Sequence, residues 1–360
     1  MQVTEQFVTI PGFEESPVAE AGRRLIAASD ALGSSQAAAA LRAWCVPHIF
    51  GQREAIFDSN EEPIALFNEV LNRTAALFEA AASSGFAGIG AAATAQDGEA
   101  TIESTTGNHY GNLFRGFSPE SYWNETAALL NMRLERNGVD IASLRDKSVL
   151  DAGCGGGRYT GAWRRLGAAP ATGLDISPIN IADARERVRI AGLDQIEFDH
   201  ANVLELPCAS DSFDIVFSNG VLHHTRDWEE GLAELVRVLK PGGLGWLYLI
   251  ENPGGLFWHS IEILREVMRP VDRETARIAL NALGIPGNRI FYMLDHVMVP
   301  INIRLTPDEV ESSLRQSGAS GIRRLTRGAD FDRIERIFQN EPYAAEKFGA
   351  GENRYLFTKA

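Results

Sequence analysis

Residues 148–157 read Ser148-Val-Leu-Asp-Ala-Gly-Cys-Gly-Gly-Gly157, an apolar run followed by an acid and four glycines. This order predicts a buried strand that turns sharply into a helix, with its backbone close to a ligand. Glycine suits such a turn because a Cβ atom would block either the turn or the close approach. The dinucleotide fingerprint G-x-G-x-x-G would need glycine at position 158, where this chain has Arg158. The spacing therefore argues against a nicotinamide cofactor.

A second acid ends the next predicted strand, Ala171-Thr-Gly-Leu-Asp175, and lies 24 residues after Asp151. A carboxylate at the end of a second strand can accept hydrogen bonds from both hydroxyls of a ribose, because it has two acceptor oxygens. The next residue, Ile176, offers an apolar face for a purine base. The two positions together predict a nucleoside site at this edge of a sheet.

Three more strands are predicted at 196–200, 213–219 and 244–250, and a final pair at 321–326 and 353–359. Polar residues follow the third and fourth strands, at Asn202 and at Asn219. The fourth strand then leads into His223 and His224. Because ligands bind at the carboxyl ends of parallel strands, these side chains are expected to gather at one edge.

These markers cover about 110 residues in order and resemble the class I S-adenosylmethionine-dependent methyltransferases, in particular their small-molecule branch, which includes the ubiquinone and menaquinone biosynthesis enzymes. The resemblance implies an α/β fold, a Rossmann-like seven-stranded, mostly parallel sheet with helices on both faces. Its last two strands would be antiparallel. The cofactor would be S-adenosyl-L-methionine.

The resemblance also implies the residues of the cofactor site. One departure is Asn202, where the family commonly has an aspartate that receives the adenine amino group. An asparagine oxygen can still accept that bond. The predicted cofactor-binding residues are Asp151, Gly153, Gly155, Gly157, Asp175, Ile176, Asn202, Val203, Asn219 and Tyr110.

Two regions precede the first strand. Residues 1–106 are predicted as a helical N-terminal region and a linker, because apolar residues recur at three and four spacing and residues 84–106 are rich in Gly, Ala, Ser and Thr. The methyltransferase domain is predicted at 107–360. Its first segment would fold over the cofactor, with Tyr110 and Tyr122 as candidate contacts, although packing of Tyr122 onto the sheet is an equal alternative.

An insertion interrupts the domain at 252–305 and is rich in large apolar residues. We expect a helical lid over the substrate, since loops on a rigid scaffold carry specificity. The alternatives are a homodimer interface or additional core. The main fold would resume at Thr306-Pro-Asp-Glu309, a capping box with proline at the first helical position.

The composition limits the kinds of partner that the protein is expected to bind. The formal net charge is −14, which argues against a nucleic-acid substrate, because proteins that grip a phosphate backbone need a basic face. No apolar stretch reaches 18 uncharged residues, so no membrane partner is expected. The three cysteines have no metal-ligand spacing, no metal site is expected, and the predicted location is the cytoplasm.

Histidines supply the candidate bases. His223 and His224 follow the fourth strand, and His296 lies in the insertion; histidine titrates near neutral pH. The predicted function is transfer of a methyl group to a small, partly apolar metabolite by in-line displacement, with oxygen favoured and nitrogen or carbon as alternatives. A non-catalytic cofactor-binding scaffold and a nicotinamide-dependent oxidoreductase are the other hypotheses.

Overall fold

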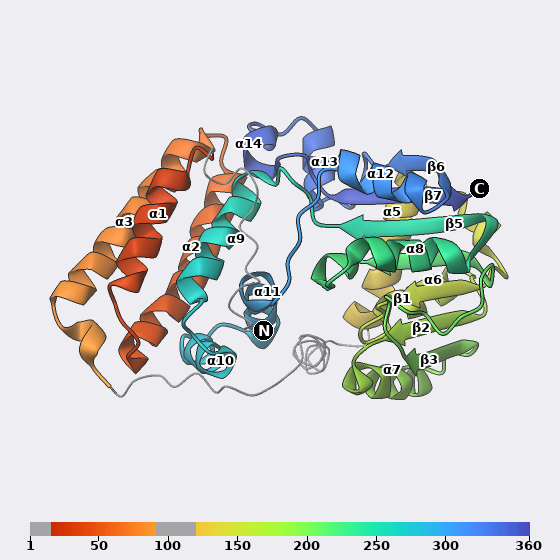
Figure 1. Cartoon of the computed structure of the whole chain (residues 1–360), viewed down its shortest axis with the longest axis horizontal. Coiled ribbons are helices and arrows are strands. Elements are labelled where there is room, and N and C mark those ends of the chain that lie inside the picture. The colour runs from red at the N-terminus through yellow and green to blue at the C-terminus, as the bar shows by residue number, and fades with distance from the viewer. Residues whose placement is uncertain (1–15, 91–119) are drawn as a thin grey trace.

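The structure is a computed structural model that describes residues 16–90 and 120–360 (Figure 1). Its centre is a seven-stranded sheet in the order β3-β2-β1-β4-β5-β7-β6. β1 to β5 are parallel, and β7 runs antiparallel to both β5 and β6. The strands are β1 Val149–Ala152, β2 Ala171–Asp175, β3 Ile196–His200, β4 Phe213–Asn219, β5 Leu239–Leu249, β6 Ala319–Arg324 and β7 Asn353–Lys359. The predicted Rossmann-like fold, including its antiparallel last pair, is confirmed.

Alternate residues of β1 face opposite layers, as the twofold period of a strand requires. Val149 packs in one apolar cluster with Trp163, while Leu150 belongs to another with Leu235. The helices of these layers are α5 Glu125–Arg136, α6 Arg158–Arg165, α7 Pro178–Ala191, α8 Trp228–Val238 and α12 Pro307–Gln316. Helices therefore cover both faces of the sheet, as predicted.

Local capping explains where several of these helices begin. The Ser177 hydroxyl accepts the amide of Asn180 at the start of α7. At α12 the Thr306 hydroxyl accepts the Glu309 amide, and the Glu309 carboxylate accepts the Thr306 amide at 2.7 Å. The capping box predicted from the sequence is thus confirmed.

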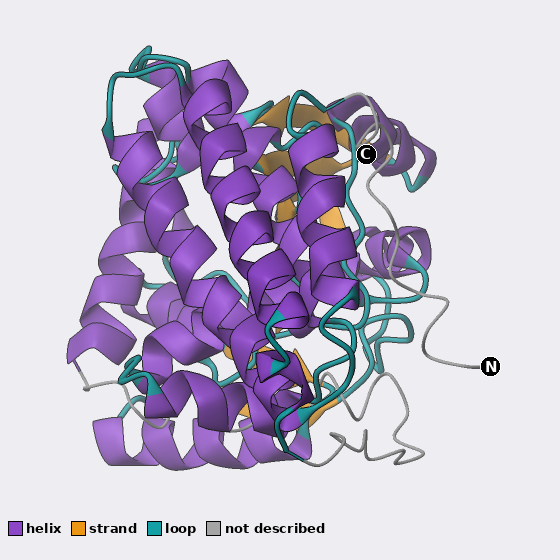
Figure 2. Cartoon of the chain, turned by 90° about the vertical axis from the view of Figure 1, so that its left-hand side faces the viewer, coloured by secondary structure: helices purple, strands orange, loops and turns teal. Residues whose placement is uncertain are grey.

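A second unit of six helices lies on one side of the sheet (Figure 1). It combines the N-terminal helices with those of the insertion, which share one apolar core. Viewed from that side, the helices stand in front of the strands (Figure 2). They are α1 Ala19–Asp30, α2 Gln36–Asp58, α3 Pro63–Ser83, α9 Gly255–Met268, α10 Arg273–Ala282 and α11 Gly287–Met298. The apolar residues of the insertion therefore pack within the chain, and its roles as lid or homodimer interface stay predictions.

The helical unit is joined to the sheet by helices α13 Arg333–Phe338 and α14 Ala344–Phe348. The buried Lys347 ammonium donates to the carbonyl oxygens of Phe57 at 2.8 Å and Ser59 at 3.1 Å. These carbonyls end α2, where the helix dipole favours a cation. The contact fixes the carboxyl end of α2 against the sheet domain.

Two strand boundaries differ from the sequence prediction. β5 begins at Leu239 rather than 244, because Leu239 pairs with Phe213 and Pro241 with Lys359 before a bulge ends at Leu244. β6 covers 319–324 rather than 321–326. The boundary predicted between 106 and 107 lies outside the described residues. Short helical turns occur at η3 Phe86–Gly88, η5 Glu120–Asn124, η6 Ile141–Leu144 and η7 Leu222–His224.

Candidate active site

The glycine run after β1 makes the turn that the sequence predicts. Gly153, Gly155 and Gly157 have φ angles of +81°, +54° and +82°, in the left-handed region that favours glycine. A Cβ atom on Gly153 would lie 2.4 Å from the Val221 side chain. A Cβ atom on Gly157 would lie 2.6 Å from the Phe198 ring. The clash at Gly153 would occur beside the pocket described below, and the clash at Gly157 would occur in the apolar cluster that contains Phe198.

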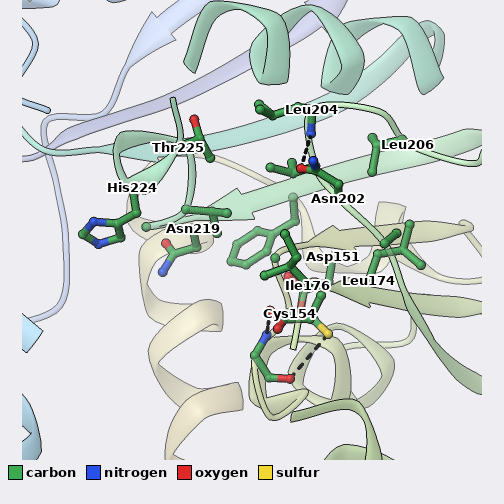
Figure 3. Close-up of a pocket in the computed structure, with 18 of the residues that line it drawn as sticks. Asp151, Cys154, Leu174, Ile176, Asn202, Leu204, Leu206, Asn219, His224 and Thr225 are labelled. Atoms are coloured by element: carbon green, nitrogen blue, oxygen red, sulfur yellow. Dashed lines mark hydrogen bonds between the residues drawn. The ribbon is translucent and has the colours of Figure 1, made fainter. Parts of the chain in front are cut away.

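A pocket opens at the carboxyl ends of β1, β2 and β4, where the strand order reverses (Figure 3). Nine predicted site residues line it: Asp151, Gly153, Gly155, Asp175, Ile176, Asn202, Val203, Asn219 and His224. Gly157, His223 and His296 do not line it, and Tyr110 lies outside the described residues. Further lining residues that the sequence analysis missed include Cys154, Tyr159, Leu174, Leu204, Phe217 and Thr225. Most of them are adjacent in sequence to the predicted residues, and this adjacency could have identified them.

Asp175 is held in place by three donors. Its Oδ2 accepts the Gly155 amide at 2.8 Å, and its Oδ1 accepts the Ser177 amide at 2.9 Å and the Asn180 side chain at 3.1 Å. Burial raises the pKa of Asp175, and these hydrogen bonds oppose that rise. A carboxylate has about four acceptor positions, so Oδ2 retains capacity for a hydroxyl donor. This leaves a position for one ribose hydroxyl, whereas the sequence suggested that the carboxylate could accept two.

Asp151 lies deeper and is 2 % exposed. The Thr160 hydroxyl donates to its Oδ2 at 2.7 Å. Burial, with a smaller contribution from the Asp175 charge, raises the pKa of Asp151 to about 7. A buried carboxylate with so high a pKa is stabilised by a cationic ligand, and the α-ammonium group of a bound amino acid would meet this need.

Asn202 departs from the predicted geometry in one respect. Its Oδ1 already accepts the backbone amide of Leu204 at 3.1 Å. An amide oxygen has two lone pairs, so one remains for an adenine amino group, and the side-chain NH2 can donate to a ring nitrogen. Apolar surface for the base comes from Ile176 and Leu206 (Figure 3).

The two adjacent histidines have different environments. His224 lines the pocket, and its Nδ1 lies 2.7 Å from the carbonyl oxygen of Ile301. Because a carbonyl can only accept, Nδ1 carries a hydrogen, and in the neutral ring the lone pair is on Nε2. His223 is 2 % exposed, and burial holds its pKa well below the usual value. Its carbonyl accepts the Ile303 amide at 2.9 Å, so its backbone fixes the loop.

His296 lies in the helical unit and is not among the residues that line the pocket. Its ring packs against Trp258 with centroids 5.5 Å apart and against Tyr292 at 4.5 Å, and its Nδ1 donates to the Tyr292 carbonyl at 2.7 Å. Burial lowers its pKa to about 4. The structure therefore brings His224 to the pocket and leaves His296 in an aromatic cluster. Tyr122, the other aromatic candidate, is buried and donates to the Gly156 carbonyl behind the glycine turn.

Part of the chain is similar in sequence to known methyltransferases. The methyltransferase-domain family matches residues 150–247. Methyltransferase GfsG of Streptomyces halstedii is 40 % identical over 96 residues, which cover 26 % of this chain and 34 % of that protein. The 27-O-demethylrifamycin SV methyltransferase of Amycolatopsis mediterranei is 33 % identical over 158 residues, which cover 42 % of this chain and 58 % of that enzyme. The tRNA U34 carboxymethyltransferase of Cellvibrio japonicus is 38 % identical over 106 residues, 29 % of this chain and 32 % of that protein.

The glycine turn, the two acids and the family match together define a class I S-adenosylmethionine-dependent methyltransferase domain. S-adenosylmethionine is therefore the cofactor of this domain, and the nicotinamide alternative is set aside. The matched segments span only 34 % and 58 % of the first two relatives. No helix among residues 16–90 and 120–360 has the length and apolar character needed to cross a membrane.

Proposed function

We propose that the chain transfers a methyl group from S-adenosylmethionine to an oxygen atom of a small, partly apolar metabolite in the cytoplasm. Nitrogen and carbon acceptors are the alternatives. The observation that carries the proposal is His224, which lines the cofactor pocket with Nδ1 fixed as a donor to Ile301. An oxygen nucleophile needs a base, and an Nε2 lone pair at this edge supplies one.

The residues of the pocket divide the work of binding. Asp175 would accept a ribose hydroxyl, Asp151 would face the ammonium group of the methionine part, and Asn202 would contact the adenine. Bound S-adenosylmethionine supplies an electrophilic methyl group on a positively charged sulfur. His224 would take the proton of the acceptor hydroxyl as the oxygen–methyl bond forms in line with the breaking sulfur–methyl bond.

A second candidate is modification of an RNA, because one group of relatives is named tRNA U34 carboxymethyltransferase. The formal net charge of −14 weighs against it, since phosphate binding needs basic surface. The rifamycin relative favours a small acceptor. The non-catalytic scaffold hypothesis predicts cofactor binding without any turnover.

The test is a methyl-transfer screen read by mass spectrometry. The purified chain is incubated with S-adenosylmethionine and, separately, a panel of phenolic and polyketide alcohols, amines, and total tRNA. We expect a mass increase of one methyl group on an alcohol and none on tRNA. Transfer to tRNA alone would replace the proposal with its RNA alternative, and cofactor binding without transfer to any acceptor would favour the scaffold.

A further inference from the structure

One buried cation in the helical unit has no carboxylate partner among the described residues. Arg53 of α2 is 2 % exposed, and its guanidinium carbon lies 4.4 Å from the ring centroids of both Phe50 and Phe257. One terminal nitrogen donates to the Ser260 hydroxyl at 2.9 Å and to the Phe257 carbonyl at 3.3 Å. Its Nε has no hydrogen-bond partner within the described chain. The Nε–H group of Arg53 is therefore buried, and no group on α2 or α9 accepts a hydrogen bond from it.

Other buried arginines of the described ranges are compensated. Arg133 pairs with Asp332 at 2.8 Å, and Arg304 pairs with Glu262. Arg42 has no carboxylate within ion-pair distance, but it donates to the Ser29 hydroxyl and to the Ser29 and Gly33 carbonyls at the end of α1. A helix end carries partial negative charge, so it favours a cation there. Within the same ranges, Arg53 has neither form of compensation.

The charges around Arg53 leave its own charge unbalanced. Glu54, the next residue on α2, forms an exposed ion pair with Arg289 at 2.9 Å. Arg333 lies 4.3 Å from the same Phe257 ring, and it already pairs with Glu251 at 2.8 Å. Burial lowers the pKa of Arg53, Tyr292 and Glu54 oppose that effect, and Arg333 adds a smaller part to it. A buried, unpaired cation is costly, and an anion bound beside it would offset that cost.

Arg53 is linked to the cofactor pocket by a chain of contacting groups. Gly220 lines the pocket, and a Cβ atom there would lie 3.6 Å from the Tyr248 ring. The centroid of that ring is 6.0 Å from the His223 ring. Tyr248 in turn interacts with Arg333, which lies over Phe257. The cluster thus extends from the edge of the pocket to α2.

Aromatic side chains lie next to the Arg53 guanidinium. Tyr292 of α11 interacts with the Arg53 guanidinium, is 39 % exposed, and packs edge-on against Phe50 with centroids 5.8 Å apart. Figure 1 places α11 between the other helices of this unit and the sheet. Tyr292 is therefore a partly exposed side chain that contacts both the buried guanidinium and the Phe50 ring.

We propose that Arg53 binds the carboxylate of the methyl acceptor, and that the acceptor is an aromatic acid whose ring packs among the aromatic side chains of α9 and α11. This inference rests on the proposed function. The Nε–H of Arg53 donates to the carboxylate, a charge-assisted hydrogen bond. A hydroxyl elsewhere on the same acceptor faces His224 and is the atom that receives the methyl group.

The experiment measures binding of a matched pair of probes, 2-naphthoate and 2-naphthamide, to the full chain saturated with S-adenosylhomocysteine. The probes differ in charge and share the same ring system. Binding is followed by ligand-observed NMR and calorimetry. We expect 2-naphthoate to bind at least tenfold more tightly than 2-naphthamide and to weaken as salt concentration rises. Equal binding of both probes, or binding of neither at millimolar concentration, overturns the proposal.

Two variants locate the effect. Arg53→Gln should weaken 2-naphthoate binding at least tenfold, while Arg73→Gln, the same substitution at a side chain of α3 that is 79 % exposed, should change it less than twofold. Both should bind S-adenosylhomocysteine as the parent chain does, which separates this inference from the proposed function. Unchanged 2-naphthoate binding in a folded Arg53→Gln protein contradicts the proposal. If that variant does not fold, Arg53→Lys and the salt dependence of the parent chain decide.

Discussion

The Nδ1 of His224 lies 2.7 Å from the carbonyl oxygen of Ile301, and this bond joins the loop after β4 to the segment after α11. A backbone carbonyl accepts only, so the bond fixes which ring nitrogen can act as a base. The Ile303 amide donates to the His223 carbonyl at 2.9 Å, which ties the same two segments a second time. The insertion therefore controls the orientation of the proposed base although it lies outside the cofactor pocket.

Replacement of that base should affect turnover and leave cofactor affinity intact. We predict that His224→Ala reduces kcat by roughly 10²- to 10⁴-fold with an oxygen acceptor, the usual contribution of a general base. The affinity for S-adenosylhomocysteine should change less than threefold. His48→Ala serves as the comparison, because His48 stacks on Trp44 within α2 and does not line the pocket, and its kcat should stay within a few-fold of the parent. An equal loss of kcat in the two variants would contradict the assignment.

Removal of the ribose acceptor should weaken cofactor binding. Asp175→Ala should cost about 1.5–3 kcal/mol of S-adenosylhomocysteine binding free energy, the scale of a hydrogen bond to a charged group. Calorimetry measures it directly. Asp199→Ala, which removes an exposed carboxylate paired with Arg185, is the matched control and should change the affinity little. Unchanged affinity in the Asp175 variant would show that Asp175 does not contact the ribose.

The affinity for S-adenosylhomocysteine should also depend on pH. The pKa of Asp151 is about 7, so the carboxyl group gains a proton and loses its charge as the pH falls below 7. Attraction to the ligand's ammonium group is then lost, and binding should weaken by up to about tenfold per pH unit between pH 7 and pH 5. Asp151→Asn should bind more weakly and without this slope. A slope of the same size in Asp151→Asn would assign the effect to another group.

The same carboxyl group makes a prediction for stability without ligand. Because the folded-state pKa is raised from 3.8 to about 7, the folded chain binds this proton more tightly than the unfolded chain does. The contribution of Asp151 to the free energy of unfolding should therefore decline as pH rises between about 4 and 7. Chemical unfolding of the parent and of Asp151→Asn at about pH 5 and about pH 8 tests this prediction, because most of the decline falls between these two pH values. The parent should lose stability relative to Asp151→Asn at the higher pH. A gain instead would contradict the assigned pKa direction.

Two glycines separate the effect of backbone strain from that of steric blocking. Gly192 has a φ of +64° and open space where a Cβ atom would lie, whereas Gly153 has a φ of +81° and a clash with Val221. Gly192→Ala should lower the free energy of unfolding by about 1–2 kcal/mol, the cost of a left-handed residue, with unchanged S-adenosylhomocysteine affinity. Gly153→Ala should lose more stability and also cofactor affinity. Equal affinities in the two variants would show that the turn after β1 does not form the site.

Local patterns were enough to predict the sheet and most of the cofactor site. β2 ends at Asp175, β4 ends at Asn219, and Gly153 follows β1. Asp175 accepts the amide of Ser177, and Thr306 that of Glu309, so short-range geometry decides these contacts. The distinction between His223 and His224 was not predictable in this way, because it depends on Ile301, 77 residues further along.

The helical unit was only partly predictable for the same reason. The periodicity of α1 and α3 identifies helices, but it does not say which surface covers them. α1 packs against α3 and also against α9, which lies far along the chain, and the bond from Arg53 to Ser260 spans 207 residues. His296 looked like a candidate base from its residue type alone, and its burial among aromatic rings became visible only once these helices were placed together.

The central claim is that the pocket at the carboxyl ends of β1, β2 and β4 binds S-adenosylmethionine, and calorimetric titration with S-adenosylhomocysteine tests it most directly. NAD is the control ligand, since its nucleoside would also need an acid after the second strand. We predict a dissociation constant in the micromolar range for S-adenosylhomocysteine and no heat of binding with NAD. Binding of NAD alone, or of neither ligand, would contradict the account.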